Sequence, residues 1–130
     1  AAFDGTFAAG LLEACAQVLT EGLSVILVAH DTPLPEPLNS VRPMGASFGT
    51  ALVLTAAPTA RSLGRLRLAP PAQDAKESVL SDPALEALRR ANPVARSLPL
   101  LTALARQQRT HIALPYVGGQ TLGVTLEPLA

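Results

Sequence analysis

A helix pattern followed after a short turn by an apolar, β-branched run restricts this chain to folds in which helices pack on sheets. The apolar residues of the helix recur at helical spacing and form one broad stripe at Phe7, Leu11, Cys15 and Val18. Asp4 or Thr6 can cap its first amides, and Gly22 can take the left-handed conformation that ends it. The predicted helix therefore runs from Thr6 to about Glu21.

The run Ser24 to His30 has no polar alternation, which predicts a strand covered on both faces. Ala46 to Ala56 predicts a second buried strand, and Gly45 and Gly49 indicate close backbone approach near its start. Hydrophobic residues make up 48% of the chain and charged residues 15%, a balance typical of buried parallel sheet. We expect an α/β fold with a mostly parallel or mixed sheet, flanking helices and a C-terminal β-hairpin.

Proline and leucine spacing predicts the segments that follow the first strand. Thr32 to Met44 carries four prolines and is expected to be an irregular surface loop, and Pro70 to Val79 a second, mobile loop. The leucines at 63, 66 and 68 are separated by Arg65 and Arg67. This alternation predicts a half-exposed strand near a sheet edge.

The last third of the chain predicts two helices and a hairpin. Asp82-Pro83 starts a short helix that Asn92-Pro93 ends, and Ser97 caps a second helix that runs to about Gln108. Two segments flank Gly118-Gly119 and predict the strands of a hairpin, His111 to Tyr116 and Thr121 to Glu127.

Composition argues against several classes of protein. Lysine plus arginine equals aspartate plus glutamate, and aromatic residues are scarce, so we expect no nucleic-acid partner. The longest apolar run, Val25 to Ala29, is far too short to span a bilayer. A single cysteine and the absence of a signal-peptide pattern favour the cytoplasm. The chain opens without Met, so we interpret residues 1–130 as one domain that is a fragment lacking its N-terminal strands.

The order of several motifs resembles the beta-ketoacyl synthase-like family, which has a thiolase-like fold. The resemblance rests on Phe7 to Ala14, the strand after it, Asp31 to Pro37 and Gly49 to Leu54. The closing segments, Ala95 to Leu101 and Leu114 to Gly119, look like the end of that family's short domain. The resemblance covers nearly all of this chain and the later part of the family's N-terminal ketosynthase-like domain.

Within that family, the chain is most similar to the chain-length-factor type. Aligning Gly5 and Gly10 with the ketosynthase pattern places Ala2 where the nucleophilic cysteine would be. The paired ketosynthase histidines have no counterpart, since neither His30 nor His111 matches their motifs. The resemblance thus implies a protein that shapes an acyl pocket beside an active ketosynthase, or as a homodimer, with acyl carrier protein as a further partner. The implied pathway is bacterial fatty-acid, polyene or polyketide synthesis.

The residues that could carry chemistry are few, and we assign none of them a catalytic, cofactor-binding or metal-binding role. Cys15 lies mid-helix on the apolar stripe, so we expect a buried core cysteine and not an activated nucleophile. Asp31 is expected to cap the following loop and His30 to sit at the sheet margin, although the end of a strand is also where ligands bind. His111 is expected to be structural or exposed. No histidine or cysteine spacing suits a metal.

Three further motifs have structural interpretations. Gly45 to Gly49 has the spacing of a nucleophile elbow around Ser47, but its strand follows the serine when it should precede it. We interpret Gly118-Gly119 as a turn and not as a phosphate-binding loop, because no predicted helix follows it. The last third is mildly basic and could meet an acidic carrier protein, but we expect solvated arginines there: Arg89, Arg90, Arg96, Arg106 and Arg109.

Two alternatives stay open at this point. One is an active beta-ketoacyl synthase or acyltransferase whose nucleophile lies upstream of Ala1. The other is an interaction domain of unrelated ancestry. We expect a helix packed on a central parallel strand within Phe7 to Ala56 if the resemblance holds, and antiparallel pairing throughout if it does not.

Overall fold

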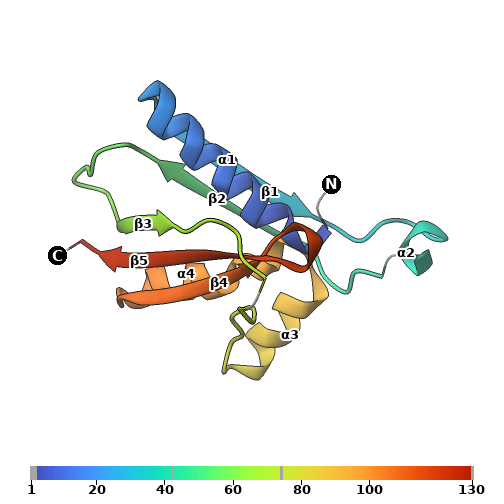
Figure 1. The fold of residues 1–130 in the computed structure, drawn as a ribbon. Coiled ribbons are helices and arrows are strands. Elements are labelled where there is room, and N and C mark those ends of the chain that lie inside the picture. Colours follow the sequence, from blue (N-terminus) through green and yellow to red (C-terminus); the bar gives the residue numbers. More distant parts are fainter. Residues whose placement is uncertain (1–2, 42, 74, 130) are drawn as a thin grey trace.

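The computed structural model of the chain describes residues 3–41, 43–73 and 75–129 (Figure 1). The described strands form two antiparallel sheets, one of order β1-β2 and one of order β3-β5-β4. The strands are β1 (Val25–Asp31), β2 (Phe48–Leu54), β3 (Gly64–Leu68), β4 (Thr110–Pro115) and β5 (Thr121–Pro128). The helices are η1 (Phe3–Gly5), α1 (Thr6–Glu21), α2 (Leu38–Val41), α3 (Pro83–Ala91), η2 (Val94–Ser97), α4 (Leu98–Arg106) and η3 (Val117–Gly119).

Helix α1 has the predicted bounds, but neither predicted N-terminal cap is used. Gly22 ends the helix with a φ of 68°, and its amide donates to the carbonyl of Val18 at 2.9 Å. At the other end the N-cap residue is Gly5, and no side chain of the described residues caps the first amides. Asp4 instead lies 3.4 Å from the Arg96 guanidinium. The N-terminal cap was mispredicted because the 3₁₀ helix η1 runs directly into α1, whereas the predicted C-terminal Gly22 was correct.

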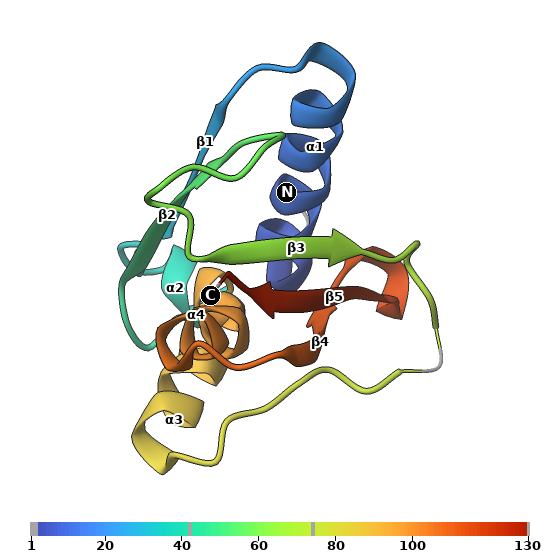
Figure 2. The ribbon, with the colours of Figure 1, turned by 90° about the vertical axis from the view of Figure 1, so that its left-hand side faces the viewer.

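Strands β1 and β2 form an antiparallel hairpin with one exposed face (Figure 2). The strands were correctly located, but the parallel sheet and the two covered faces were wrong. Ile26 is 66% exposed and lies opposite Val53, which is 67% exposed. The burial alternates because α1 packs on one side of the hairpin, while the outer side carries no other described element.

The second sheet confirms the predicted hairpin and edge strand. β4 pairs with β5 around Gly118 and Gly119, whose φ values of 64° and 74° suit glycine. β3 lies at the sheet edge and alternates in burial. The expected α/β class holds, with antiparallel pairing in place of the expected parallel sheet.

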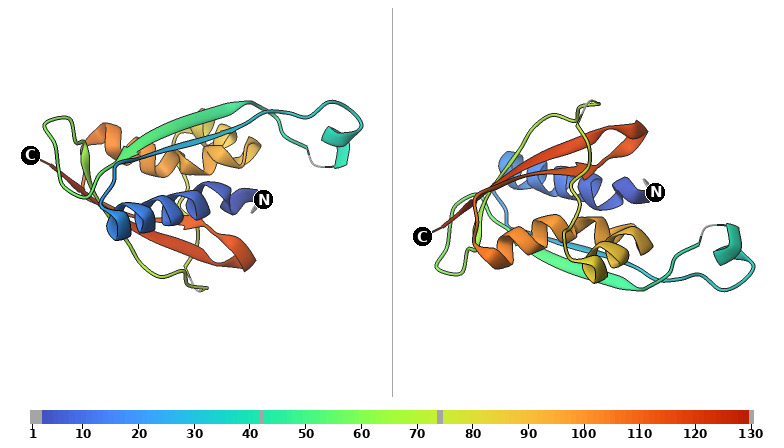
Figure 3. Two further views of the ribbon diagram at one scale, coloured as in Figure 1. Left: turned by 90° about the horizontal axis from the view of Figure 1, so that it is seen from above. Right: turned by 90° about the horizontal axis from the view of Figure 1, so that it is seen from below.

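The connecting segments largely follow the prolines. Residues Thr32–Ser47, which we call the arm, protrude from the body and include the short helix α2 within the expected irregular loop (Figure 3). Asp82 caps α3 as predicted, accepting the amides of Ala84 and Leu85, and α3 ends before Asn92. Ser97 precedes α4 but does not cap it. Its hydroxyl donates to the Val94 carbonyl at 2.7 Å, because η2 already leads into α4.

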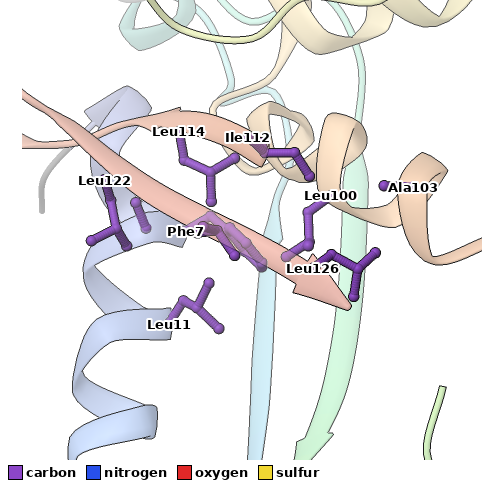
Figure 4. Packing of buried hydrophobic residues seen from close by; sticks show 10 residues of the cluster. Phe7, Leu11, Leu100, Ala103, Ile112, Leu114, Leu122 and Leu126 are labelled. Atoms are coloured by element: carbon purple, nitrogen blue, oxygen red, sulfur yellow. The ribbon is translucent and has the colours of Figure 1, made fainter. Parts of the chain in front are cut away.

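The hydrophobic core joins the two sheets through the helices between them (Figures 3 and 4). Phe7 and Leu11 of α1 and Leu100 of α4 are at most 2% exposed. Each such side chain contributes about 1.5–3 kcal/mol when fully buried. The sheet side of this cluster consists of Ile112, Leu114, Leu122, Val124 and Leu126. The core thus holds α1 against the β4–β5 hairpin, and this packing sets the position of the start of α1 in space.

Gly5 should be intolerant of a side chain. A Cβ added there would lie 2.7 Å from the carbonyl carbon of Tyr116. This is a backbone atom, so it cannot move aside as the end of a side chain could. We therefore expect Gly5→Ala to lower the free energy of unfolding by about 1–3 kcal/mol, measured by urea denaturation. Gly45→Ala is the matched control, since its Cβ would meet only the Ala91 Cβ at 3.4 Å. Equal stability of the two variants would contradict the proposed close contact.

Candidate functional site

The start of α1, the end of β1, the start of β2 and the turn of the β4–β5 hairpin lie at one end of the molecule (Figure 1). The expected alignment puts the ketosynthase nucleophile position just before α1 in the sequence. Ala2, the residue aligned with that nucleophile, lies outside the described residues. The chemistry of this end therefore has to be judged from the residues around it.

Asn92 is the central polar side chain of this end and is 1% exposed. Its Nδ2 donates to the carbonyl of Asp31 at 3.1 Å and to that of Ala46 at 2.8 Å. Its Oδ1 accepts the amide of Val94 at 2.8 Å. One side chain thus ties the last residue of β1 and the far end of the arm to η2. The sequence identified Asn92 only as a helix stop.

The two hydroxyls at the base of the arm bond to each other, and no described side chain acts as a base toward them. Thr32 Oγ1 and Ser47 Oγ lie 2.8 Å apart, and both residues are exposed. Asp31 Oδ1 accepts the Thr32 amide at 2.9 Å, which agrees with the expected capping of the loop. His30 is exposed on the outer side of β1, opposite Gly49. Ser47 precedes β2, so the geometry contains no nucleophile elbow at Gly45 to Gly49.

The expected solvated arginines divide into two groups. Arg89 is 3% exposed, and its Nε and Nη2 each donate to Glu86 at 2.7 Å. Glu77 lies 3.5 Å from Arg89 and 3.1 Å from Arg96, so it joins both guanidinium groups. The expectation was wrong for Arg89 and Arg96, because carboxylates from a loop and from α3 neutralise them. Arg90, Arg106 and Arg109 are exposed, and Arg109 pairs with Glu127.

Cys15 and His111 agree with their structural interpretations. Cys15 is half-buried against the core, and burial raises the pKa of its thiol, which disfavours the nucleophilic thiolate. His111 is exposed, and its Nδ1 lies 3.0 Å from the hydroxyl of Thr125, its cross-strand neighbour. No third group in the described residues orients this pair, so it is a cross-strand hydrogen bond.

Two hollows were not foreseen from the sequence. One, of about 290 Å³, lies between Ser78–Asp82, α4 and β4, but its carboxylate, Asp82, is already used as a helix cap. The other, of about 310 Å³, is a groove between α1 and β1 lined by Gly10, Glu13, Ala14, Gln17 and Val25–Val28. Within the part of the chain that the structure describes, no group of His, Cys, Asp or Glu could hold a metal ion. None of the described helices is long and apolar enough to cross a membrane.

The comparison with protein families decides the ancestry of the chain. The model described as beta-ketoacyl synthase, N-terminal domain, matches residues 1–116. The chain belongs to this beta-ketoacyl synthase family. No curated protein and no solved structure matches it.

Membership of the beta-ketoacyl synthase family confirms the resemblance and removes the alternative of an unrelated interaction domain. It also shows that our expectation about strand pairing was wrong. All described strand pairs are antiparallel, yet the chain belongs to the family. The expectation failed because β1 pairs with β2 along one of its edges. This one antiparallel pair does not show which strands belong beside the other edge of β1.

Asn92 should contribute to stability through the carbonyls that it satisfies. Asn92→Ala leaves the Asp31 and Ala46 carbonyls without this donor. We expect the free energy of unfolding to fall by about 1–3 kcal/mol in urea denaturation. Asn39→Ala is the control, because the Asn39 side chain accepts the Met44 amide, at 3.2 Å, within the arm itself. A larger loss for Asn39→Ala would contradict the central role of Asn92.

Glu86 should make stability depend on pH below its ordinary pKa of 4.5. The hydrogen-bonded Arg89 guanidinium, with the Leu80 amide, lowers the pKa of the Glu86 carboxyl to about 2. The stabilising effect of its charge is therefore complete above pH 4.5 and is lost as the pH falls toward 2. We expect Glu86→Gln to flatten the decline of unfolding free energy over this range, measured by urea denaturation at each pH. Glu21→Gln controls for net charge, and identical declines in wild type and Glu86→Gln would refute the assignment.

Proposed function

We propose that this domain is a non-catalytic ketosynthase-like protein of the chain-length-factor type. The observation that carries the proposal is that the described hydroxyls and thiol have no catalytic surroundings. A condensing enzyme needs a nucleophile that is activated by its position or by an adjacent base. Two described hydroxyls do contact a base, Ser40 at Glu36 and Thr125 at His111, but no further described side chain orients either base.

The described nucleophile candidates fail for separate physical reasons. Cys15 lies in the middle of α1, away from the helix N-terminus that would stabilise a thiolate. Ser47 and Thr32 bond to each other. Ser40 donates to Glu36 within the exposed arm, where no buried donors surround the pair to stabilise an oxyanion.

The Gly5 and Gly10 register supports the same proposal from the sequence. It aligns Ala2 with the ketosynthase nucleophile, and a methyl side chain cannot attack a thioester. Gly5 packs against Tyr116 by backbone contact, so the chain entering α1 has a defined path. In this proposal the domain keeps the ketosynthase framework while alanine replaces its reactive group.

The proposed role is to shape an acyl pocket beside an active ketosynthase, or in a homodimer, and so to help set product length. The pathway class is bacterial fatty-acid, polyene or polyketide synthesis in the cytoplasm, with residues 1–130 as one portion of a larger ketosynthase-like domain. Acyl carrier protein is the further partner. Arg90 and Arg106 are exposed members of the basic group that could meet its acidic surface, and Arg109 is exposed beside Glu127, whereas Arg89 and Arg96 are held by Glu77.

The proposal predicts that the purified chain is not acylated by an acyl-coenzyme A thioester. Acylation would require a side-chain thiol or hydroxyl to attack the thioester carbonyl and release coenzyme A as the free thiol. We expect intact-mass spectrometry to show only the unmodified chain after incubation. A stoichiometric adduct mapped to Cys15, or to any other residue, would refute the proposal.

A gain-of-function variant tests the register. Ala2→Cys should introduce a thiol that reacts with iodoacetamide faster than Cys15, because the new thiol would precede α1 while Cys15 is half-buried. Ala9→Cys is the matched control, since it places a new thiol within α1 itself. Equal reactivity of the two introduced thiols would argue against placing Ala2 at the nucleophile position.

A further inference from the structure

Residues 75–81 run along the outer edge of β4 and contain no helix or strand (Figure 2). We call this segment the strap. Each of its residues is exposed or half-buried, and Val79 is 64% exposed. Apolar burial therefore contributes little to holding the strap in place, and its position depends on a few polar contacts.

Ser78 makes the first of these contacts, with the edge of β4. Its amide donates to the Ala113 carbonyl at 2.8 Å, and its hydroxyl accepts the Ala113 amide at 2.9 Å. On its other side Ala113 pairs with Gly123 of β5, so the strap lies where a further strand of this sheet would pair. The edge of β4 is thus already occupied by residues of this chain.

Glu77 makes the second contact, with two arginines outside the strap. Its carboxylate lies 3.5 Å from the guanidinium of Arg89 and 3.1 Å from that of Arg96. Neither arginine depends on Glu77 alone, since Arg89 also pairs with Glu86 and Arg96 with Asp4. Release of Glu77 leaves each guanidinium with a carboxylate, which avoids the large cost of an unpaired buried charge.

The third contact is also one that can break without disturbing the helix beside it. The amide of Leu80 donates to Oε1 of Glu86 at 2.9 Å. Glu86 keeps its two bonds to Arg89 when this amide leaves, because those bonds lie within α3. The strap can therefore separate from α3 and η2 while both keep their own ion pairs.

The strap also forms one wall of the hollow of about 290 Å³ that lies beside α4 and β4. Residues 78–81 supply this wall. Ala103 of α4 and Ile112 of β4 line the same hollow and are 5% and 2% exposed. Displacement of the strap would therefore uncover an apolar surface together with the edge of β4.

We propose that the strap is a cover that opens and closes as a unit while the two sheets stay folded, and that Glu77 holds it closed. Ser78 and Glu77 are neighbours, so their contacts break together. Water then satisfies the outward amide and carbonyl of Ala113. A segment with few buried apolar contacts opens at a lower free energy than the core. The strap thus controls access to the hollow and to the edge of β4, and this inference does not depend on the proposed function.

Hydrogen exchange, measured for each amide by NMR on the complete 130-residue chain, tests whether the strap opens as a unit. We expect the Ser78 and Ala113 amides to have opening constants that agree within about twofold. These constants should exceed those of Val124 and Leu126, in the central strand β5, by about tenfold or more. Unequal constants for Ser78 and Ala113, or opening only together with β5, would overturn the proposal.

Glu77→Gln tests the role of the carboxylate. We expect it to speed exchange of the Ser78 and Ala113 amides by about two- to tenfold and to leave that of Val124 unchanged. Glu127→Gln is the matched control, because Glu127 pairs with Arg67 and Arg109, which lie outside the strap and its contacts. Unchanged exchange at Ser78 and Ala113 in Glu77→Gln, or an equal increase at Val124, would overturn the assignment of Glu77.

A thiol on the lining of the hollow tests whether the strap controls access to it. In a Cys15→Ala background, Ala103→Cys introduces the only thiol of the chain. We expect iodoacetamide to label this thiol faster when Glu77→Gln is added, by the same factor as the amide exchange. Addition of Glu127→Gln should leave the labelling rate unchanged. Equal labelling rates with and without Glu77→Gln would overturn the control of the hollow by the strap.

Discussion

The structure depends on α1, whose apolar face packs between the two sheets and covers a two-stranded hairpin that is too small to be stable alone. A two-stranded hairpin is marginal in water, and the three-stranded sheet has a single apolar face. Phe7 and Leu11 contact the core made by β4, β5 and α4, while Gly10 allows Leu27 of β1 to approach the same helix. Because one helix serves both sheets, the hairpin and the sheet are expected to unfold together.

Local signals in the sequence located most elements correctly. The stripe on α1, the left-handed Gly22, the Asp82 cap and the glycine pair of the β4–β5 turn each act within a few residues, so pattern alone identifies them. The strand faces could not be assigned this way. An apolar run such as Val25–Ala29 does not reveal whether a second layer covers it, since the same residues occur on an interior face and on a binding face.

The buried polar residues show the same difference between contacts that are local in the sequence and contacts that are distant in it. The Arg89–Glu86 pair spans three positions on one helix and could have been read from the sequence, but Glu77 reaches Arg89 from a loop whose path depends on the whole fold. Asn92 was recognised as a helix stop only, because its bonds to Asp31 and Ala46 cross 61 and 46 residues. Family membership was accessible from motif order, whereas the groove beside β1 required the packing of α1.

The bonds of Asn92 also separate the arm from the rest of the fold. They fix the carbonyls of Asp31 and Ala46 relative to η2, so the hairpin has a closed base whatever the path of the chain between them. Chain-closure entropy changes by only about 0.6 kcal/mol for each doubling of loop length. The segment from Pro33 to Val41 can therefore be lengthened, shortened or given new side chains at little cost to the sheets, which makes it the part of this domain best suited to diversification.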